Sequence, residues 1–120
     1  MADSLRYETA VKVLLQYVPE FRRVSNFEND ESEPTYVFGV FGLFLRDTIM
    51  QGSTPVETIE TSFNLLNEMA SSDDDEIVNL IEVTVFEILT DSPKTIGVAR
   101  QRLFGKALSR FEQVVQTWKG

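Results

Sequence analysis

The segment from Ile77 to Leu89 is apolar on almost every side of a helix, and this feature constrains the fold more than any other. A helix that is apolar all round is stable only when other elements surround it. We therefore expect this helix in the middle of the fold. Its apolar residues are Ile77, Val78, Leu80, Ile81, Val83, Val85, Phe86, Ile88 and Leu89.

Three further segments carry apolar residues at spacings of three and four, which predicts amphipathic helices over residues 4–18, 55–70 and 104–118. Asp3 or Ser4 can cap the first, Pro19 interrupts or kinks it, and Phe21 continues its apolar face. Thr54, Pro55 and Glu57 form an N-terminal signature for the second. Its expected buried face is Val56, Ile59, Phe63, Leu66 and Ala70. In the third, the apolar face is Phe104, Ala107, Leu108, Phe111, Val114, Val115 and Trp118, with Trp118 expected to face the core.

Residues 36–50 are ambiguous, because their aromatic and β-branched residues also suit a buried strand. Their length and Gly52 at a plausible C-terminal cap favour a helix. In that helix Gly39 and Gly42 would let a neighbouring backbone approach closely. Residues 25–35 predict an acidic mobile loop, and residues 95–103 predict a short helix.

These segments predict an all-α fold, a single domain over residues 1–120 with five to six helices packed as antiparallel pairs. The chain contains no cysteine and no histidine, which excludes thiol and imidazole catalysis. No secretory signal or run long enough to cross a bilayer is evident, so we expect a cytoplasmic protein.

Charge is sorted along the chain, whose net charge is -8. From Asp47 to Pro93 there are eleven carboxylates and no lysine or arginine, whereas Lys94 to Gly120 carries six basic residues and one acid, Glu112. Such a one-sided stretch projects a negative field and predicts a positively charged partner. Folding could also lay Arg100, Arg102, Lys106 and Arg110 against the acids.

The candidate partner-binding residues are carboxylates. Glu57, Glu60 and Glu68 are expected on the exposed face of the 55–70 helix, and Ser72 is the expected cap before the acids that follow it. Glu82 lies within an apolar surface. It either reaches the edge of the helix pair, pairs with an arginine of the C-terminal segment, or lies in a groove and meets a partner's cation. The full set is Glu31, Glu33, Glu57, Glu60, Glu68, Asp73, Asp74, Asp75, Glu76 and Glu82.

The sequence does not favour catalysis or cofactor binding. A carboxylate pair remains available for acid and base chemistry, but no pair stands out, so we expect no enzyme and no cofactor. The acids from Asp73 to Glu76 lack the spacing of a calcium loop, so no metal site is expected. The excess of acids argues against direct binding of nucleic acid.

Two resemblances extend this interpretation. The acidic helix start at Asp73, following an amphipathic helix, resembles one unit of a HEAT-type repeat. A second pattern covers Leu14 to Phe21, the Glu-Pro loop leading to Val37–Gly39, Leu66 to Asp74, Val78 to Leu80 and Phe86 to Leu89. Through this pattern the chain resembles small acidic helical bacterial proteins encoded beside polymorphic toxins, including those of contact-dependent growth inhibition. The basic C-terminal helix departs from the pattern.

The second resemblance implies an immunity protein, or antitoxin, that captures a cognate basic toxin domain and blocks it sterically and electrostatically. Two other functions stay open: a nucleic-acid mimic that inhibits a defence enzyme, and a non-catalytic interaction or scaffold domain. A scaffold could dimerise through its basic helix and acidic middle, although a monomer is the expected state.

Overall fold

A computed structural model describes residues 6–21, 33–52 and 56–119, without the side chains of Trp118 and Lys119. The described residues form only helices, which confirms the all-α prediction. The elements are η1 (Tyr7–Thr9), α1 (Ala10–Tyr17), α3 (Pro34–Gln51), α4 (Val56–Ala70), α5 (Asp75–Ile81), η2 (Glu82–Phe86), α6 (Glu87–Leu89), α7 (Pro93–Arg102) and α8 (Gly105–Lys119). None of the described helices is long and apolar enough to cross a membrane.

The described residues contain seven α-helices, so the predicted count of five to six was slightly low. The reason lies in the central segment, where a π-helical stretch, η2, separates α5 from α6. The Thr84 hydroxyl donates a hydrogen bond of 2.6 Å to the Leu80 carbonyl oxygen, the acceptor that an α-helical Thr84 N–H would use. A side-chain donor at that carbonyl favours a local departure from α-helical bonding.

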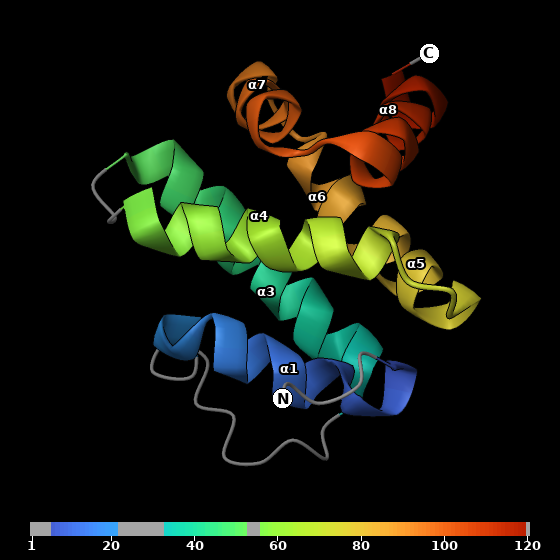
Figure 1. The fold of residues 1–120 in the computed structure, drawn as a ribbon. Coiled ribbons are helices and arrows are strands. Elements are labelled where there is room, and N and C mark those ends of the chain that lie inside the picture. The colour runs from blue at the N-terminus through green and yellow to red at the C-terminus, as the bar shows by residue number, and fades with distance from the viewer. Residues whose placement is uncertain (1–5, 22–32, 53–55, 120) are drawn as a thin grey trace.

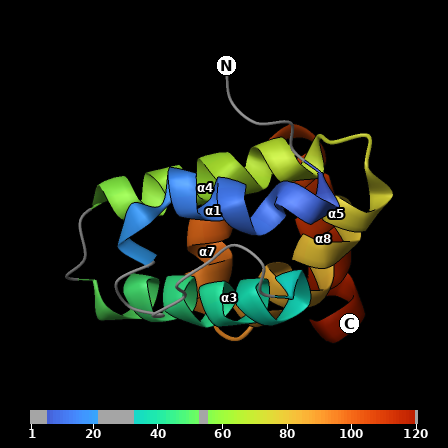
Figure 2. The same ribbon diagram turned by 90° about the horizontal axis from the view of Figure 1, so that it is seen from below.

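The central position of this segment is confirmed. Ile77, Ile81, Val85, Phe86 and Leu89 are completely buried. Contacts from α3 and α8 reach η2, and α4 packs against α5 and α8. Figure 1 shows α4 running across the middle of the molecule, with α1 on one side and the α7–α8 pair on the other. Figure 2 shows α3 on the side of the molecule opposite α1 and α4.

Helix α3 settles the ambiguity over residues 36–50 in favour of a helix. It begins earlier than predicted, at Pro34, because the Glu33 carboxylate caps it by accepting a hydrogen bond of 2.9 Å from the Thr35 N–H. It ends as predicted at Gly52, which adopts a left-handed conformation with φ 69°.

Gly42 brings α3 close to the central segment, whereas Gly39 does not. A Cβ atom at Gly42 would lie 2.7 Å from Ile88 Cδ1 and 3.2 Å from the Val85 Cα atom. The predicted close approach is therefore confirmed for Gly42. It was wrong for Gly39, where a Cβ atom would meet nothing within 4 Å, because Gly39 is turned away from the central segment.

Aromatic side chains fill much of the core. Phe21 and Phe41 meet edge to face with centroids 5.3 Å apart, and Phe86 meets Phe111 of α8 in the same way at 5.5 Å. Phe21 is buried and continues the apolar face of the first helix, as predicted, because helical backbone resumes after Val18 and spans residues 19–21. Among the residues predicted to be buried, Val56 is 58% exposed because it begins α4 at the edge of the molecule, and Val83 of the central segment is 45% exposed. The predicted caps Asp3, Ser4 and Thr54 and the side chain of Trp118 lie outside the described residues.

Candidate functional site

The candidate site lies along the exposed edge of α4. Glu57, Glu60, Asn64 and Glu68 are all exposed, as the helical spacing predicted. The opposite side of α4 is held by buried apolar residues, with Phe63, Leu66 and Met69 at most 1% exposed. The core therefore fixes the orientation of this edge.

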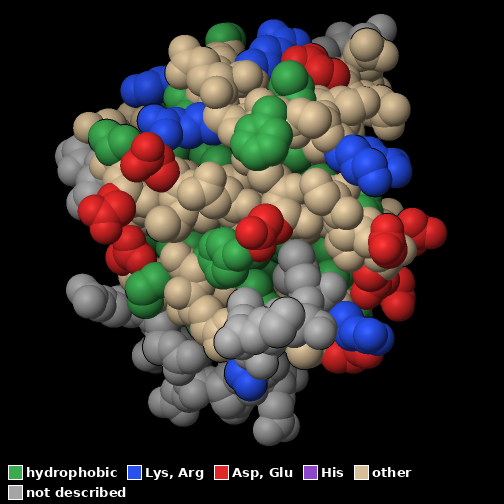
Figure 3. Space-filling model, in the orientation of Figure 1, with side chains coloured by type: hydrophobic (Ala, Val, Ile, Leu, Met, Phe, Trp, Pro, Cys, Tyr) green, Lys and Arg blue, Asp and Glu red, His purple; other side chains and the backbone are tan. Residues whose placement is uncertain are grey.

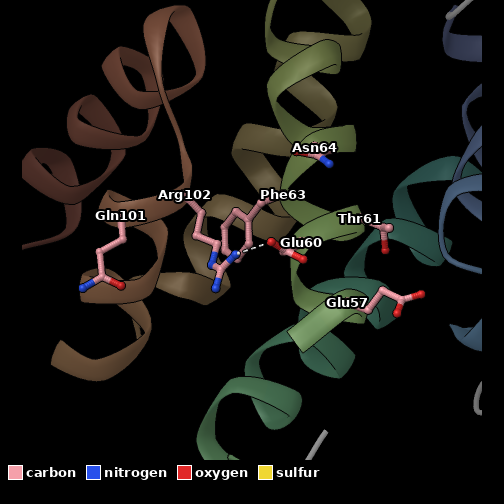
Figure 4. A pocket seen from close by; sticks show the side chains of 7 residues that line it. All are labelled: Glu57, Glu60, Thr61, Phe63, Asn64, Gln101 and Arg102. Atoms are coloured by element: carbon pink, nitrogen blue, oxygen red, sulfur yellow. Dashed lines mark ion pairs between the residues drawn. The ribbon is translucent and has the colours of Figure 1, made fainter. Parts of the chain in front are cut away.

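Glu60 is paired within the chain. Arg102 of α7 places its Nη1 atom 3.6 Å from Glu60 Oε2 of α4. Figure 4 shows the Arg102 side chain directed toward Glu60, with the ion pair dashed. The two side chains lie in a cavity of about 590 Å³ that also includes Glu57 and Gln101. Figure 4 shows Glu57 further along α4 and Gln101 directed away from Glu60. The first cavity thus already contains one of the chain's own guanidinium groups.

Glu68 lines a second cavity, of about 640 Å³, between α1, α4 and the corner where α7 meets α8. The Tyr17 hydroxyl of α1 donates a short hydrogen bond to Glu68 Oε2. This hydrogen bond, together with partial burial and the negative charge of Glu68, raises the pKa of Tyr17 to about 12. Asn64 lines both cavities, so they adjoin along the same edge of α4.

The acidic residues around the start of α5 differ in what their side chains do. Asp74 is the N-cap of α5: its Oδ1 atom accepts a hydrogen bond of 3.0 Å from the Glu76 N–H. Its Oδ2 atom accepts another of 3.0 Å from the Tyr7 N–H. The prediction that Ser72 caps the helix was wrong, because α5 begins later and Ser72 instead accepts a hydrogen bond from the Asp74 N–H. Asp73, Asp75 and Glu76 are exposed and have no side-chain partner among the described residues.

The remaining candidate carboxylates lie elsewhere. Glu82 of η2 pairs with Arg110 of α8 at 3.6 Å, which is the intramolecular alternative predicted for it. Glu33 caps α3, and its Oε1 atom also lies 3.5 Å from the Tyr7 hydroxyl. Glu31 and most of the predicted acidic loop lie outside the described residues.

Charge remains partly sorted in the folded chain. Figure 3 shows acidic side chains near both ends of α4 and basic side chains mainly over α7 and α8. Ion pairs join the two regions, because Arg102 and Arg110 meet Glu60 and Glu82. Arg100 instead pairs within the C-terminal segment, where its Nε atom lies 2.7 Å from Glu112 Oε2. Hydrogen bonding to Arg100 lowers the pKa of Glu112.

Phe104 is the residue of this site that the sequence prediction missed. It was expected in the core with the apolar face of residues 104–118, yet it is 67% exposed and lines the second cavity. Leu103 ends α7 in an extended conformation and is buried, with 3% exposure. Because successive side chains of an extended backbone point in opposite directions, Phe104 is directed outward. Gly105, which follows with φ 55°, was the signal for a sharp change of direction.

Asn67 of α4 holds the backbone around Phe104 in place. Its Oδ1 atom accepts a hydrogen bond of 3.1 Å from the Phe104 N–H, and its Nδ2 atom donates one of 3.2 Å to the Arg102 carbonyl oxygen. Asn67 is only 6% exposed. A buried amide with both ends bonded to one backbone segment fixes the position of that segment.

The described carboxylates do not gather into a metal-binding group. Within the described residues, no group of three or more histidine, cysteine, aspartate or glutamate side chains could hold a metal ion. The carboxylates of α4 and the α5 turn are strung along one face, with Phe104 beside the α4 segment that separates them.

Comparison with known proteins places the chain in a family without assigning it an activity. No curated protein and no solved structure matches the chain. One family matches residues 11–119, which span every described α-helix except the first residue of α1. The chain therefore belongs to the family described as Domain of unknown function (DUF7674).

Proposed function

We propose that this protein is an immunity protein that binds a cognate basic toxin domain and blocks it sterically and electrostatically. The observation that carries the proposal is the set of unpaired carboxylates on the α4–α5 face. Glu57, Asp73, Asp75 and Glu76 are exposed and have no ion-pair partner among the described residues. At the rise of an α-helix, α4 from Glu57 to its end at Ala70 spans roughly 20 Å of this face.

Charge of this kind acts mainly on the rate of association. A negative face attracts a basic domain over a distance comparable to the Debye length, about 10 Å at moderate salt. Tight binding then depends on a few desolvated contacts near the centre of the interface. In this proposal the protein acts in the cytoplasm without a cofactor and is not an enzyme, because blockade requires only that it cover the toxin.

The resemblance to immunity proteins of polymorphic toxin systems supports the class of partner, and the HEAT-like pairing of antiparallel helices remains part of the proposal. A monomer is favoured over a head-to-tail dimer. Arg102 and Arg110 are already paired with Glu60 and Glu82 inside the chain. Fewer basic groups therefore remain to meet the acidic face of a second copy.

The first test is coexpression with a toxin domain encoded by the neighbouring gene. Growth should be rescued by this protein if the two form an immunity pair. A neighbouring gene product that is non-toxic, or toxicity that this protein does not relieve, would contradict the proposal.

The second test measures the association rate with that toxin domain at low salt. The triple variant Asp73→Asn, Asp75→Asn, Glu76→Gln should associate about five- to tenfold more slowly, since charges at an interface rim act on the association rate. The control is Asp47→Asn, Glu87→Gln, Asp91→Asn, which removes as many charges from α3, α6 and the turn after α6, although Asp47 and Asp91 both pair with Arg46. Equal rates for the two triple variants would remove the α5 turn from the binding face.

A further inference from the structure

The two adjoining cavities along α4 differ in whether a basic side chain of the chain itself meets their carboxylate. In the first cavity the carboxylate of Glu60 meets the Arg102 guanidinium at 3.6 Å. Glu68 lies two helical turns further along the same edge, roughly 12 Å away along the axis. It lines the second cavity, whose lining among the described residues contains no lysine or arginine.

The second cavity is lined by groups that suit a cationic side chain. Tyr17 and Phe104 supply two aromatic rings, and Asn64, Ser71 and Ser72 supply oxygen atoms that can accept hydrogen bonds. Glu68 Oε2 is used by the Tyr17 hydroxyl, whereas Oε1 has no partner among the described residues. Tyr17 thereby holds the carboxylate in place and leaves one oxygen available.

The exposed ring of Phe104 is positioned before any partner arrives. A single exposed phenylalanine is common and means little on its own. Here Asn67, nine-tenths buried, bonds the backbone on both sides of Leu103 and fixes where the ring emerges. An aromatic ring and a carboxylate that line the same cavity offer a guanidinium a face to stack on and an oxygen to pair with.

We propose that the cavity formed by Tyr17, Glu68 and Phe104 binds an arginine side chain presented by the partner protein. The guanidinium donates to Glu68 Oε1 while its plane lies against the Phe104 ring, and Asn67 acts as the positioning residue. Arginine suits the site better than lysine, because its guanidinium is planar, is more weakly hydrated and stacks on aromatic rings. The inference rests on the proposed function only for the source of the arginine.

The test uses the isotope-labelled full chain and N-acetyl-arginine amide as the probe, followed by amide chemical shifts. Shifts should concentrate on Asn67, Glu68 and Phe104. N-acetyl-citrulline amide, which has a similar shape but no charge, should produce much smaller shifts. Arginine shifts that instead centre on Asp73 to Glu76, equal shifts with citrulline, or no shifts at all would overturn the proposal.

Variants separate the roles of the two side chains. Phe104→Ala should weaken arginine binding about two- to fivefold, the usual value of an exposed cation–π contact, and Phe104→Trp should keep or improve it. Glu68→Gln should weaken it by a similar factor, whereas Asp91→Asn, with the same change of charge outside the cavity, should not. Unchanged binding in both Phe104→Ala and Glu68→Gln would overturn the assignment.

The arginine titration and the growth rescue fail independently. Rescue without arginine binding at this cavity would leave the immunity role intact and remove the arginine site. Arginine binding without rescue by any neighbouring toxin would leave the site intact and remove the immunity role. Neither result depends on the stability of the fold, because Phe104 and Glu68 are both exposed.

Discussion

The two glycines of α3 allow helix propensity to be separated from packing in one experiment. Gly39 and Gly42 lie in the same helix, and neither is among the glycines with positive φ. Replacing either by alanine should therefore bring the same gain in helix propensity, about 1 kcal/mol. Any difference between Gly39→Ala and Gly42→Ala then measures what the added methyl group meets.

The contacts at Gly42 set the expected magnitude. A methyl group there overlaps Ile88 Cδ1 at 2.7 Å, which a side-chain rotation could relieve. It also lies 3.2 Å from the Val85 Cα atom, which moves only if α3 and η2 separate by a few tenths of an ångström. Overpacking of this kind costs about 1–3 kcal/mol. We expect Gly39→Ala to be more stable than Gly42→Ala by that amount. Because the propensity gain offsets part of the cost, the stability of Gly42→Ala should lie between that of the wild type and about 2 kcal/mol below it.

Urea denaturation followed by far-UV circular dichroism measures the difference in the free energy of unfolding. Each kcal/mol should move the melting temperature by about 3–6 °C for a domain of this size. Ile88→Val removes the Cδ1 atom that the alanine methyl group at position 42 would overlap. The substitution Ile88→Val should therefore destabilise the Gly42→Ala protein less than the wild type, by at least about 0.5 kcal/mol. If Gly42→Ala stabilises the protein as much as Gly39→Ala, the close approach of α3 to η2 is refuted.

Three other predictions each follow from a single side chain. Asp74→Ala should lower the free energy of unfolding by about 1–2 kcal/mol, because α5 loses its cap and the Tyr7 N–H loses its acceptor. Asp73→Ala should change it by less than about 0.5 kcal/mol, and equal losses in urea denaturation would contradict the assignment of the cap. In an absorbance titration one of the three tyrosines, Tyr17, should ionise only near pH 12, and Glu68→Gln should return its pKa toward 10.0. Because folding raises the pKa of Tyr17, the stability contributed by the Tyr17–Glu68 hydrogen bond should be complete below about pH 10 and lost as the pH rises through about 12. If Glu68→Gln leaves the tyrosine titration unchanged, this hydrogen bond is excluded as the cause of the raised pKa. Thr95→Val should cost about 1–3 kcal/mol in thermal or urea denaturation, because the fully buried hydroxyl donates to the Leu89 carbonyl oxygen at 2.7 Å and accepts from the Ser92 N–H in the capping box of α7. A loss under about 0.5 kcal/mol would show that these two hydrogen bonds contribute little.

Much of the helix pattern could be predicted because it depends on neighbours within one or two turns. The periodicity of residues 55–70 located α4 and its exposed acids, and Gly52 located the end of α3. The all-round apolar character of Ile77–Leu89 placed that segment at the centre. Each of these features is encoded locally, by side chains three or four positions apart or by a single capping residue.

Local rules failed where several residues could satisfy them equally. Ser72 and Asp74 are both good caps, and the choice of Asp74 accompanies its second hydrogen bond, to the distant Tyr7 N–H. Phe104 fitted the apolar stripe of the last helix, but the extended backbone at Leu103 turned it outward. The π-helical stretch η2 has no signature in the apolar pattern, because that pattern is the same for a regular helix.

The sequence by itself determined that the chain is helical, that Ile77–Leu89 is central and that the acids of α4 are exposed, because these properties follow from the period of a helix and the cost of exposing apolar surface. Only the tertiary structure decided which acids remain available. Glu60 and Glu82 are met by Arg102 and Arg110, residues remote in the chain that packing brings to 3.6 Å. Long-range packing likewise places Phe104 and Glu68 in the lining of one cavity. A one-dimensional pattern records which charges a segment carries, whereas the three-dimensional fold decides which of them meet a partner inside the molecule and which face outward.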